Sequence, residues 1–321
     1  MPSPERPAPP ALATSLSSPV PPGAAYGARA VRLVATDLDN TLLRSDKTVS
    51  PRTDAALRAA AAAGITVVPV TARQRLGLVT VAPQFVELAD SFGGWAVCSN
   101  GALGLDLVTG RRLFEATMNV ADQRDLVVRL TAAVPDVRFC AVRDGGDGFL
   151  VEAGYAELSV WADHNRDPRR MQVVGRSALA DTPNNKMVAR HPVLTARDLL
   201  DAFRALDLPG LQATSSGAPF LEVSAAGVGK AYGLQRLTDH LGIAAAQVVA
   251  LGDGLNDLDM LAWAGWGVAM ANAEPELRAA ADQVAPGCDE DGFAQVLEAL
   301  IARAATDSGA PATGSEAPAI R

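Results

Sequence analysis

Short apolar runs that end in polar or acidic residues recur along the chain, and they predict buried β-strands. The runs are 31–35, 65–70, 95–98, 248–251 and 266–270. Between the first two lies an Ala-rich helical segment, which begins at Ser50-Pro51 and ends at Gly64. A strand, a helix and a second strand at this spacing indicate a βαβ unit, and therefore a parallel sheet with a right-handed crossover.

The region 103–214 has a different pattern and predicts a separate α+β module. Within 138–153, the turn sequence DGGDG separates two strand-like runs, and 184–190 indicates another strand. The segments 123–134 and 195–206 have helical periodicity. We therefore expect an antiparallel sheet inserted into the parallel α/β domain, whose own pattern resumes at 220.

The two ends of the chain are expected to be disordered tails. Residues 1–30 are rich in Pro, Ala and Ser, and 305–321 are small and polar. Prolines interrupt every apolar stretch of 1–30, so a signal peptide is not expected there. The predicted organisation is a core in two parts, 31–102 and 215–304, with the inserted module 103–214 between them.

Composition excludes several classes of function. The 321-residue chain has a net charge of -8, and no run of Lys or Arg exceeds a pair, which is atypical of nucleic-acid binding. Its three cysteines are far apart and are expected to be free thiols in a reducing cytoplasm. No stretch is long and apolar enough to span a bilayer, so a membrane partner is not expected. The pattern carries no signal for an oligomeric state.

Asp37 and Asp39 follow the first predicted strand. Residues two apart in an extended strand point to the same face, so both carboxylates are expected to face one cleft while Leu38 packs the other way. Paired carboxylates suit a hard cation such as Mg2+ and a phosphoryl group. For an isolated D-x-D, an acidic turn before a helix is the more common interpretation.

Later polar residues reach the same predicted sheet edge. Thr71 ends the second strand, where its hydroxyl either donates to a phosphate oxygen or caps the next helix. Asp253 ends a further strand, and Asn256 and Asp257 follow on the expected face of a helical turn. Asn100 lies in an Asn-Gly turn, where turn chemistry is the main interpretation and substrate contact the minor one.

Lys230 follows Gly227 and Gly229 at the start of a predicted helix. A Walker-type phosphate loop is excluded because Ala231 stands where Ser or Thr is required. The pattern G-x-G-x-x-x-G, completed by Gly233, is only a weak dinucleotide signal, since no strand-end acid follows about 20 residues later. The ammonium group is therefore expected at a helix N-terminus facing an anion, with a solvated surface lysine as the alternative.

Taken in order, DLDNTLL, Thr71, Lys230 and GDGLNDLDML resemble the four motifs of the haloacid dehalogenase-like (HAD) superfamily. The sequences AMANA and DEDGFAQVLEAL resemble its Cof-type branch. The resemblance covers residues 31–304 and implies a doubly wound, Rossmann-like parallel-sheet core with a type IIB cap inserted between the second and third motifs. Asn40 and Ala72 are departures, because Gly is common at both positions in relatives.

The resemblance also implies phosphoryl transfer through an aspartyl-phosphate. Asp37 would be the nucleophile and Asp39 the general acid and base, with Mg2+ held by Asp37, the backbone carbonyl of Asp39, Asp253 and Asp257. Asn256 would orient the phosphate or a metal ligand. The remaining phosphate contacts would come from the side chains of Thr71 and Lys230 and the backbone amides of Leu38, Asp39 and Ala72.

These implications predict a Mg2+-dependent phosphatase for a small phosphomonoester, such as a sugar phosphate or related metabolite. A phosphosugar mutase on the same scaffold and a phospho-ligand sensor without turnover are the alternatives. Within the cap, Arg143, Asp144 and Lys186 are candidates for substrate contact, although such residues are more often solvated.

Overall fold

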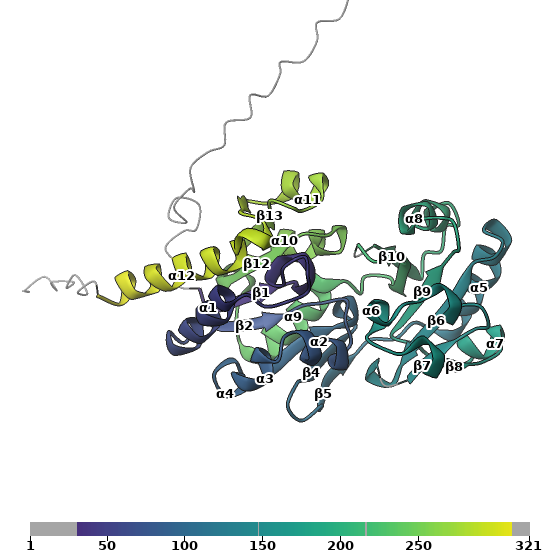
Figure 1. Ribbon diagram of the computed structural model, residues 1–321, viewed down its shortest axis with the longest axis horizontal. Coiled ribbons are helices and arrows are strands. Elements are labelled where there is room, and N and C mark those ends of the chain that lie inside the picture. The colour runs from purple at the N-terminus through teal and green to yellow at the C-terminus, as the bar shows by residue number, and fades with distance from the viewer. Residues whose placement is uncertain (1–30, 147, 216, 310–321) are drawn as a thin grey trace, which may run out of the picture.

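The computed structural model describes residues 31–146, 148–215 and 217–309, which form a core and a cap, each with its own sheet (Figure 1). The core sheet is parallel, with the order β14-β13-β12-β1-β2. Its strands are β1 (Leu33–Thr36), β2 (Thr66–Pro69), β12 (Val248–Gly252), β13 (Trp266–Met270) and β14 (Gln283–Ala285). In this order β1 lies between β12 and β2, so the sheet extends to both sides of the first strand, as in the predicted doubly wound fold.

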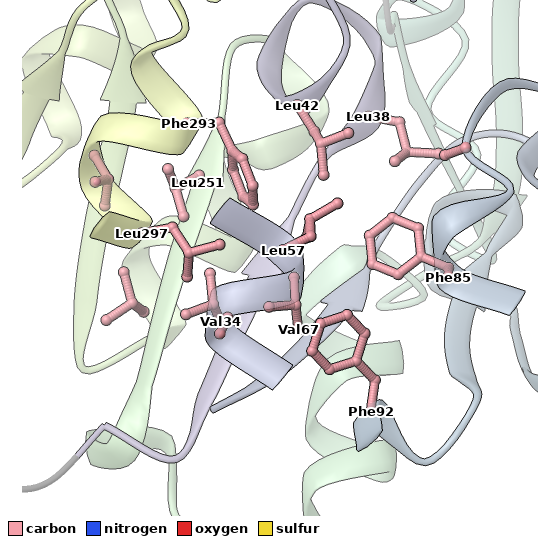
Figure 2. Close-up of a cluster of buried hydrophobic side chains, with 14 of the residues drawn as sticks. Val34, Leu38, Leu42, Leu57, Val67, Phe85, Phe92, Leu251, Phe293 and Leu297 are labelled. Carbon is pink, nitrogen blue, oxygen red and sulfur yellow. The ribbon is translucent and has the colours of Figure 1, made fainter. Parts of the chain in front are cut away.

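Helices cover both faces of the core sheet because side chains alternate along each strand. Val34 of β1 packs in one layer, shown in Figure 2 with Leu57 and Phe293, whereas Leu33 and Ala35 pack in the other. The Val34 layer contains α1 (Pro51–Ala62), α2 (Arg75–Val81), α3 (Gln84–Glu87), α4 (Ala89–Phe92) and α12 (Gly292–Gly309). The opposite layer contains α9 (Lys230–Leu241), α10 (Leu258–Trp263) and α11 (Pro275–Ala280).

Local signals define the first helix as predicted. The Thr53 N–H donates to Ser50 Oγ at 3.0 Å, and Pro51 occupies the first turn, where its missing N–H costs no hydrogen bond. Beyond the last residue of α1, Gly64 adopts a φ of 72°, which a residue without a Cβ accepts readily. The chain then enters β2.

A small antiparallel sheet belongs with the core, which corrects the predicted boundary at residue 103. It consists of β3 (Trp95–Cys98), β4 (Leu103–Asp106) and β5 (Arg112–Glu115). A parallel bridge between Val70 and Val97 joins it to the end of β2. Leu103 and Leu105 pack into the Val34 layer, so apolar contacts with the core hold this hairpin.

The cap is built on a six-stranded sheet with the order β10-β11-β9-β6-β7-β8. Its pairs are antiparallel except β7 with β8. The strands are β6 (Arg138–Arg143), β7 (Gly148–Val151), β8 (Gln172–Val173), β9 (Lys186–Arg190), β10 (Leu211–Thr214) and β11 (Leu221–Ala225). The cap helices are α5 (Val120–Ala133), α6 (Trp161–His164), α7 (Arg176–Leu179) and α8 (Ala196–Arg204).

The assignment of β11 corrects a second boundary, since the parallel pattern was expected to resume at 220. β11 pairs with β9 and β10, and its Leu221 and Val223 pack with the α5 and α8 side of the cap. An alternating strand pattern shows which residues share a face but leaves open which sheet the strand joins.

The predicted tails lie mostly outside the described residues, which exclude 1–30 and 310–321. Residues 305–309 are an exception: they continue α12, so the C-terminal tail does not begin at 305. Over the part of the chain that is described, no helix has the length and apolar character needed to cross a bilayer.

Candidate active site

Three strand ends meet at one edge of the core sheet. Thr36 lies opposite Leu251 of β12 and Pro69 of β2, so the residues that follow these strands emerge side by side. The Asp37 N–H donates to the Leu251 carbonyl at 2.9 Å, and the Val70 N–H donates to the Thr36 carbonyl at 2.8 Å. The parallel register therefore places Asp37, Thr71 and Asp253 at a common edge, as expected.

A buried lysine joins two of the acids at this edge. Lys230 Nζ donates to Asp37 Oδ1 at 2.5 Å and to Asp257 Oδ1 at 2.5 Å, and neither Lys230 nor Asp257 has exposed surface. The other oxygen of Asp257 accepts the backbone N–H groups of Asp253 and Gly254, each at 3.0 Å. The ammonium is thus a fixed, desolvated charge beside the predicted nucleophile.

The acids outnumber this lysine. One carboxylate oxygen from each of Asp37, Asp253 and Asp257 lies within 4.8 Å of the others. Burial, followed by the charge of Asp257, raises the pKa of Asp253 to about 7. Burial acts to lower the pKa of Lys230, but the attraction of Asp257 and Asp37 outweighs it and raises that pKa above its usual value. Three carboxylates against one ammonium leave a negative excess that a divalent cation would neutralise, and an all-oxygen donor set suits Mg2+.

Asp39 lies apart from this acidic cluster and is bound by Arg73. Arg73 Nε and Nη2 donate to the two carboxylate oxygens at 2.7 Å each, and Lys47 Nζ lies 3.3 Å from Oδ1. Burial acts to raise the pKa of Asp39, but the hydrogen bonds and charge of Arg73 hold it below its usual value. Asp39 is therefore ionised while Arg73 is bound.

Asp37 and Asp39 both line one cavity, and both lie beyond the last residue of β1. β1 ends at Thr36, but the backbone is still extended at Asp37 and Asp39, and the chain turns only after both acids, at Asn40, which has φ 59° and ψ 15°. Asparagine tolerates this left-handed conformation better than most residues, which accounts for its presence where Gly was expected. The two acids therefore face one cleft from extended backbone positions two residues apart, although β1 itself ends before them. Leu38 packs in the core, as expected.

The other predicted phosphate-binding residues divide into two groups. Thr71, Ala72 and Asn256 are among the described residues that line the cavity, and Thr71 Oγ1 accepts the Arg73 N–H at 3.1 Å. Asn100 is absent from that lining: its Nδ2 donates to Glu222 at 3.1 Å, and its Oδ1 accepts from Asn256 at 3.0 Å.

The cavity has a volume of about 280 Å³ and lies between core and cap. The cap contributes the end of α6, the start of β9 and the segment that leads into β11. The cap residues are Ala162, Asp163, His164, Asn165, Lys186, Gly217, Ala218, Pro219, Phe220 and Glu222.

Of the three candidates in the cap, the structure brings only Lys186 to the cavity. Arg143 lies elsewhere in the cap, where its Nε donates to Asn184 Oδ1 at 2.8 Å, and Asp144 is in the turn after β6. Sequence reasoning missed Arg73, which also donates to Asn165 of the cap at 2.6 Å. The available signal was its position two residues after Thr71, at the end of a strand.

Comparisons with known proteins agree with this architecture. The family model for haloacid dehalogenase-like hydrolases matches residues 34–297. Phosphatase YwpJ of Bacillus subtilis (strain 168) is 27% identical over 294 residues, which cover 84% of this chain and 100% of that protein. An HMP-PP phosphatase of Serratia proteamaculans (strain 568) is 29% identical over 269 residues, covering 83% and 94% of the two chains.

A solved structure shows the same fold. It is a sugar phosphatase of HAD subclass IIB, with a TM-score of 0.71 and 21% identity, covering 83% of this chain and 98% of that one. The chain belongs to the haloacid dehalogenase-like hydrolases, in the Cof-type branch, and it shares its fold with the subclass IIB protein. It is accordingly an enzyme of the HAD phosphatase class.

Proposed function

We propose that this enzyme is a Mg2+-dependent phosphatase that hydrolyses a small phosphomonoester, such as a sugar phosphate or related metabolite, through an aspartyl-phosphate on Asp37. The observation that carries this proposal is the placement of Lys230 Nζ 2.5 Å from both Asp37 and Asp257, with Asp253 beside them. A cytoplasmic location is supported by the three cysteines, which are free and buried.

In the first half-reaction, an Asp37 carboxylate oxygen attacks phosphorus, and the bond from phosphorus to the leaving oxygen breaks. Thr71, which lines the cavity, and Lys230, which contacts Asp37, would bind the phosphoryl oxygens as charge moves toward the leaving group. Asp39 gives a proton to the leaving alkoxide, which departs as an alcohol. The cation, when bound by Asp37, Asp253, Asp257 and the Asp39 carbonyl, supplies positive charge that offsets the acids facing an anionic substrate.

In the second half-reaction, Asp39 takes a proton from water, whose oxygen attacks the phosphorus of the aspartyl-phosphate. Inorganic phosphate leaves, and the Asp37 carboxylate is restored. Asp39 can carry a proton only when its bidentate contact with Arg73 is released, because that contact favours the ionised carboxylate. Release of Arg73 is therefore part of the proposed cycle.

The test is phosphate release from a panel of phosphorylated metabolites, with Mg2+ and with EDTA. Wild type is expected to release phosphate only with Mg2+, and Asp37→Asn is expected to be folded and inactive because its amide is a poor nucleophile. Asp46→Asn is the matched control, since Asp46 lies on an exposed turn and bonds only to Thr48 among the hydrogen bonds described. A folded, active Asp37→Asn would refute the nucleophile assignment. Appearance of a phospho-isomer instead of phosphate would indicate a mutase.

A further inference from the structure

A chain of buried polar contacts runs from the cap into the core. It begins at an ion pair on adjacent cap strands, where Lys186 Nζ of β9 lies 2.5 Å from Glu222 Oε1 of β11. Lys186 is 5% exposed and Glu222 3% exposed. Two opposite charges withdrawn from water in this way require further polar partners. Those partners belong to the core.

Both members of the pair contact loops of the candidate active site. Lys186 Nζ donates to the Ala72 carbonyl at 3.0 Å, directly after Thr71. Glu222 Oε2 accepts from Asn100 Nδ2 at 3.1 Å, and Asn100 Oδ1 accepts from Asn256 Nδ2 at 3.0 Å. The amide of Asn100 must therefore donate on one side and accept on the other, which fixes its orientation.

The backbone of Asn100 is held in an unusual conformation. Asn100 has φ 52° and ψ 41°, and Ser99 before it also has φ 52°. Consecutive non-glycine residues with positive φ cost conformational free energy, and they persist where surrounding contacts fix them. Among those contacts, the Asn100 N–H donates to the Thr71 carbonyl at 3.0 Å, and the Ser99 N–H donates to the Arg73 carbonyl at 3.0 Å.

The same turn lies against the start of α9. A Cβ added to Gly101 would be 1.8 Å from the Gly229 carbonyl oxygen, so the two backbones are in direct contact one residue before Lys230. The turn at Asn100 thus contacts the Thr71 loop, the Asn256 loop and the helix start that carries Lys230. Each of these segments holds part of the candidate site.

We propose that the Lys186–Glu222 pair and Asn100 are positioning residues. They set the relative placement of the Thr71 loop, the Asn256 loop and the start of α9, so that the cap forms part of the active-site framework. This inference rests on the proposed function. It separates Asn100 from substrate contact, because both polar atoms of its side-chain amide are already bonded, one to Glu222 and the other to Asn256.

Lys186 and Glu222 themselves line the cavity, so their role must be distinguished from substrate contact. The main variant is Asn100→Gly, which keeps a left-handed backbone and removes only the side-chain links. Asp136→Gly is the matched control, since Asp136 also has a positive φ, of 65°, and its side chain is 72% exposed in the cap. Glu222→Gln tests the ion pair, and the double variant Asn100→Gly/Glu222→Gln tests whether both act together.

Each variant is assayed with p-nitrophenyl phosphate and with the best metabolite of the panel. Asn100→Gly is expected to lower kcat by about 10- to 100-fold with both substrates, as is common when residues that orient site groups are removed. KM should change by less than about threefold. The double variant should have about the same kcat as the less active of the two single variants, because both changes break the same chain of contacts. Asp136→Gly should retain wild-type kcat.

Wild-type kcat in Asn100→Gly would overturn the proposal, as would a Glu222→Gln defect confined to KM for the metabolite. The second result would assign Glu222 to substrate contact. If the wild-type protein hydrolyses none of the substrates, the proposed function fails. The positioning role of Asn100 can then still be tested by measuring how the unfolding midpoint depends on the Mg2+ concentration. Asn100→Gly is expected to require about tenfold more Mg2+ to reach half of the Mg2+-induced rise in the unfolding midpoint. The reason is that Asn100 bonds to Asn256, which directly precedes the predicted metal ligand Asp257. An unchanged Mg2+ requirement would refute the positioning role.

Discussion

Replacing Lys230 by methionine removes one charge from the centre of the site while keeping an unbranched side chain of similar length. Lys230 Nζ contacts Asp37 and Asp257 at 2.5 Å each, and the residue is fully buried. The variant therefore leaves two buried carboxylates without their cationic partner. Stability, metal binding and turnover should all respond, and not in the same direction.

The expected loss of unfolding free energy without Mg2+ is about 3–5 kcal/mol, the usual cost of removing one partner from a buried ion pair. That is a large share of the total of about 5–15 kcal/mol for a typical protein. Turnover is expected to fall by about 10²–10³, because a preorganised positive charge is lost from the phosphoryl site. Lys230→Arg, which keeps the charge, is the variant to use if Lys230→Met does not fold.

Mg2+ affinity should change in the opposite direction. Without the ammonium, the carboxylates of Asp37, Asp253 and Asp257 attract a cation more strongly. Two unit charges about 5 Å apart interact by about 3 kcal/mol at an effective dielectric constant of about 20. Lys230→Met is therefore expected to bind Mg2+ at least about tenfold more tightly, a difference of about 1.4 kcal/mol.

The assay follows the unfolding midpoint across a Mg2+ titration, together with kcat/KM on the best substrate. Lys47→Met is the matched control for stability, since the Lys47 side chain is 44% exposed and its ion pair with Asp39 should contribute less than about 1 kcal/mol. Wild-type kcat/KM in Lys230→Met would refute the phosphate role. Unchanged stability and unchanged Mg2+ affinity would refute the buried pairing itself.

Two further predictions concern the fold around the site. Gly101→Ala should lower the unfolding free energy by about 2 kcal/mol or more, because the added Cβ would meet the Gly229 carbonyl. Gly242→Ala is the control: Gly242 has φ 63° and open space around it, so this change should cost about 1 kcal/mol. Equal urea unfolding midpoints for the two variants would contradict the close contact at Gly101. His164 packs against aromatic rings, and its burial, followed by the charge of Lys186, lowers its pKa to about 3. In the unfolded chain the same imidazole has a pKa of about 6.5. Below about pH 6.5 the unfolded chain therefore binds one more proton than the folded protein, and the stability of the fold decreases as the pH falls. The unfolding free energy should fall by about 1–2 kcal/mol between about pH 7.5 and about pH 5. Asp163, Glu222 and Arg190 are the other charged residues that act on the ring. If His164→Phe shows the same dependence of stability on pH as the wild type, His164 is not its source.

The sequence by itself determined the strand ends and several of the side chains that meet there. Apolar runs marked β1, β2 and β12. The βαβ spacing implied that β1 and β2 are parallel, and the pattern that resumes after the inserted module indicated that β12 joins them, so Asp37, Thr71 and Asp253 were expected at one edge. Local chemistry also defined α1 through Ser50 and placed Lys230 at the start of α9. These features depend on neighbours in sequence or on the periodicity of one element.

The tertiary structure alone decided which long-range partners these residues have. The contact of Arg73 with Asp39 spans 34 positions, that of Lys186 with Ala72 spans 114, and that of Asn100 with Glu222 spans 122. The alternation of β11 fitted either sheet, and only its pairing with β9 and β10 assigned it to the cap. Hydrophobic periodicity shows which face of an element is buried, whereas polar partners depend on how the folded elements pack together.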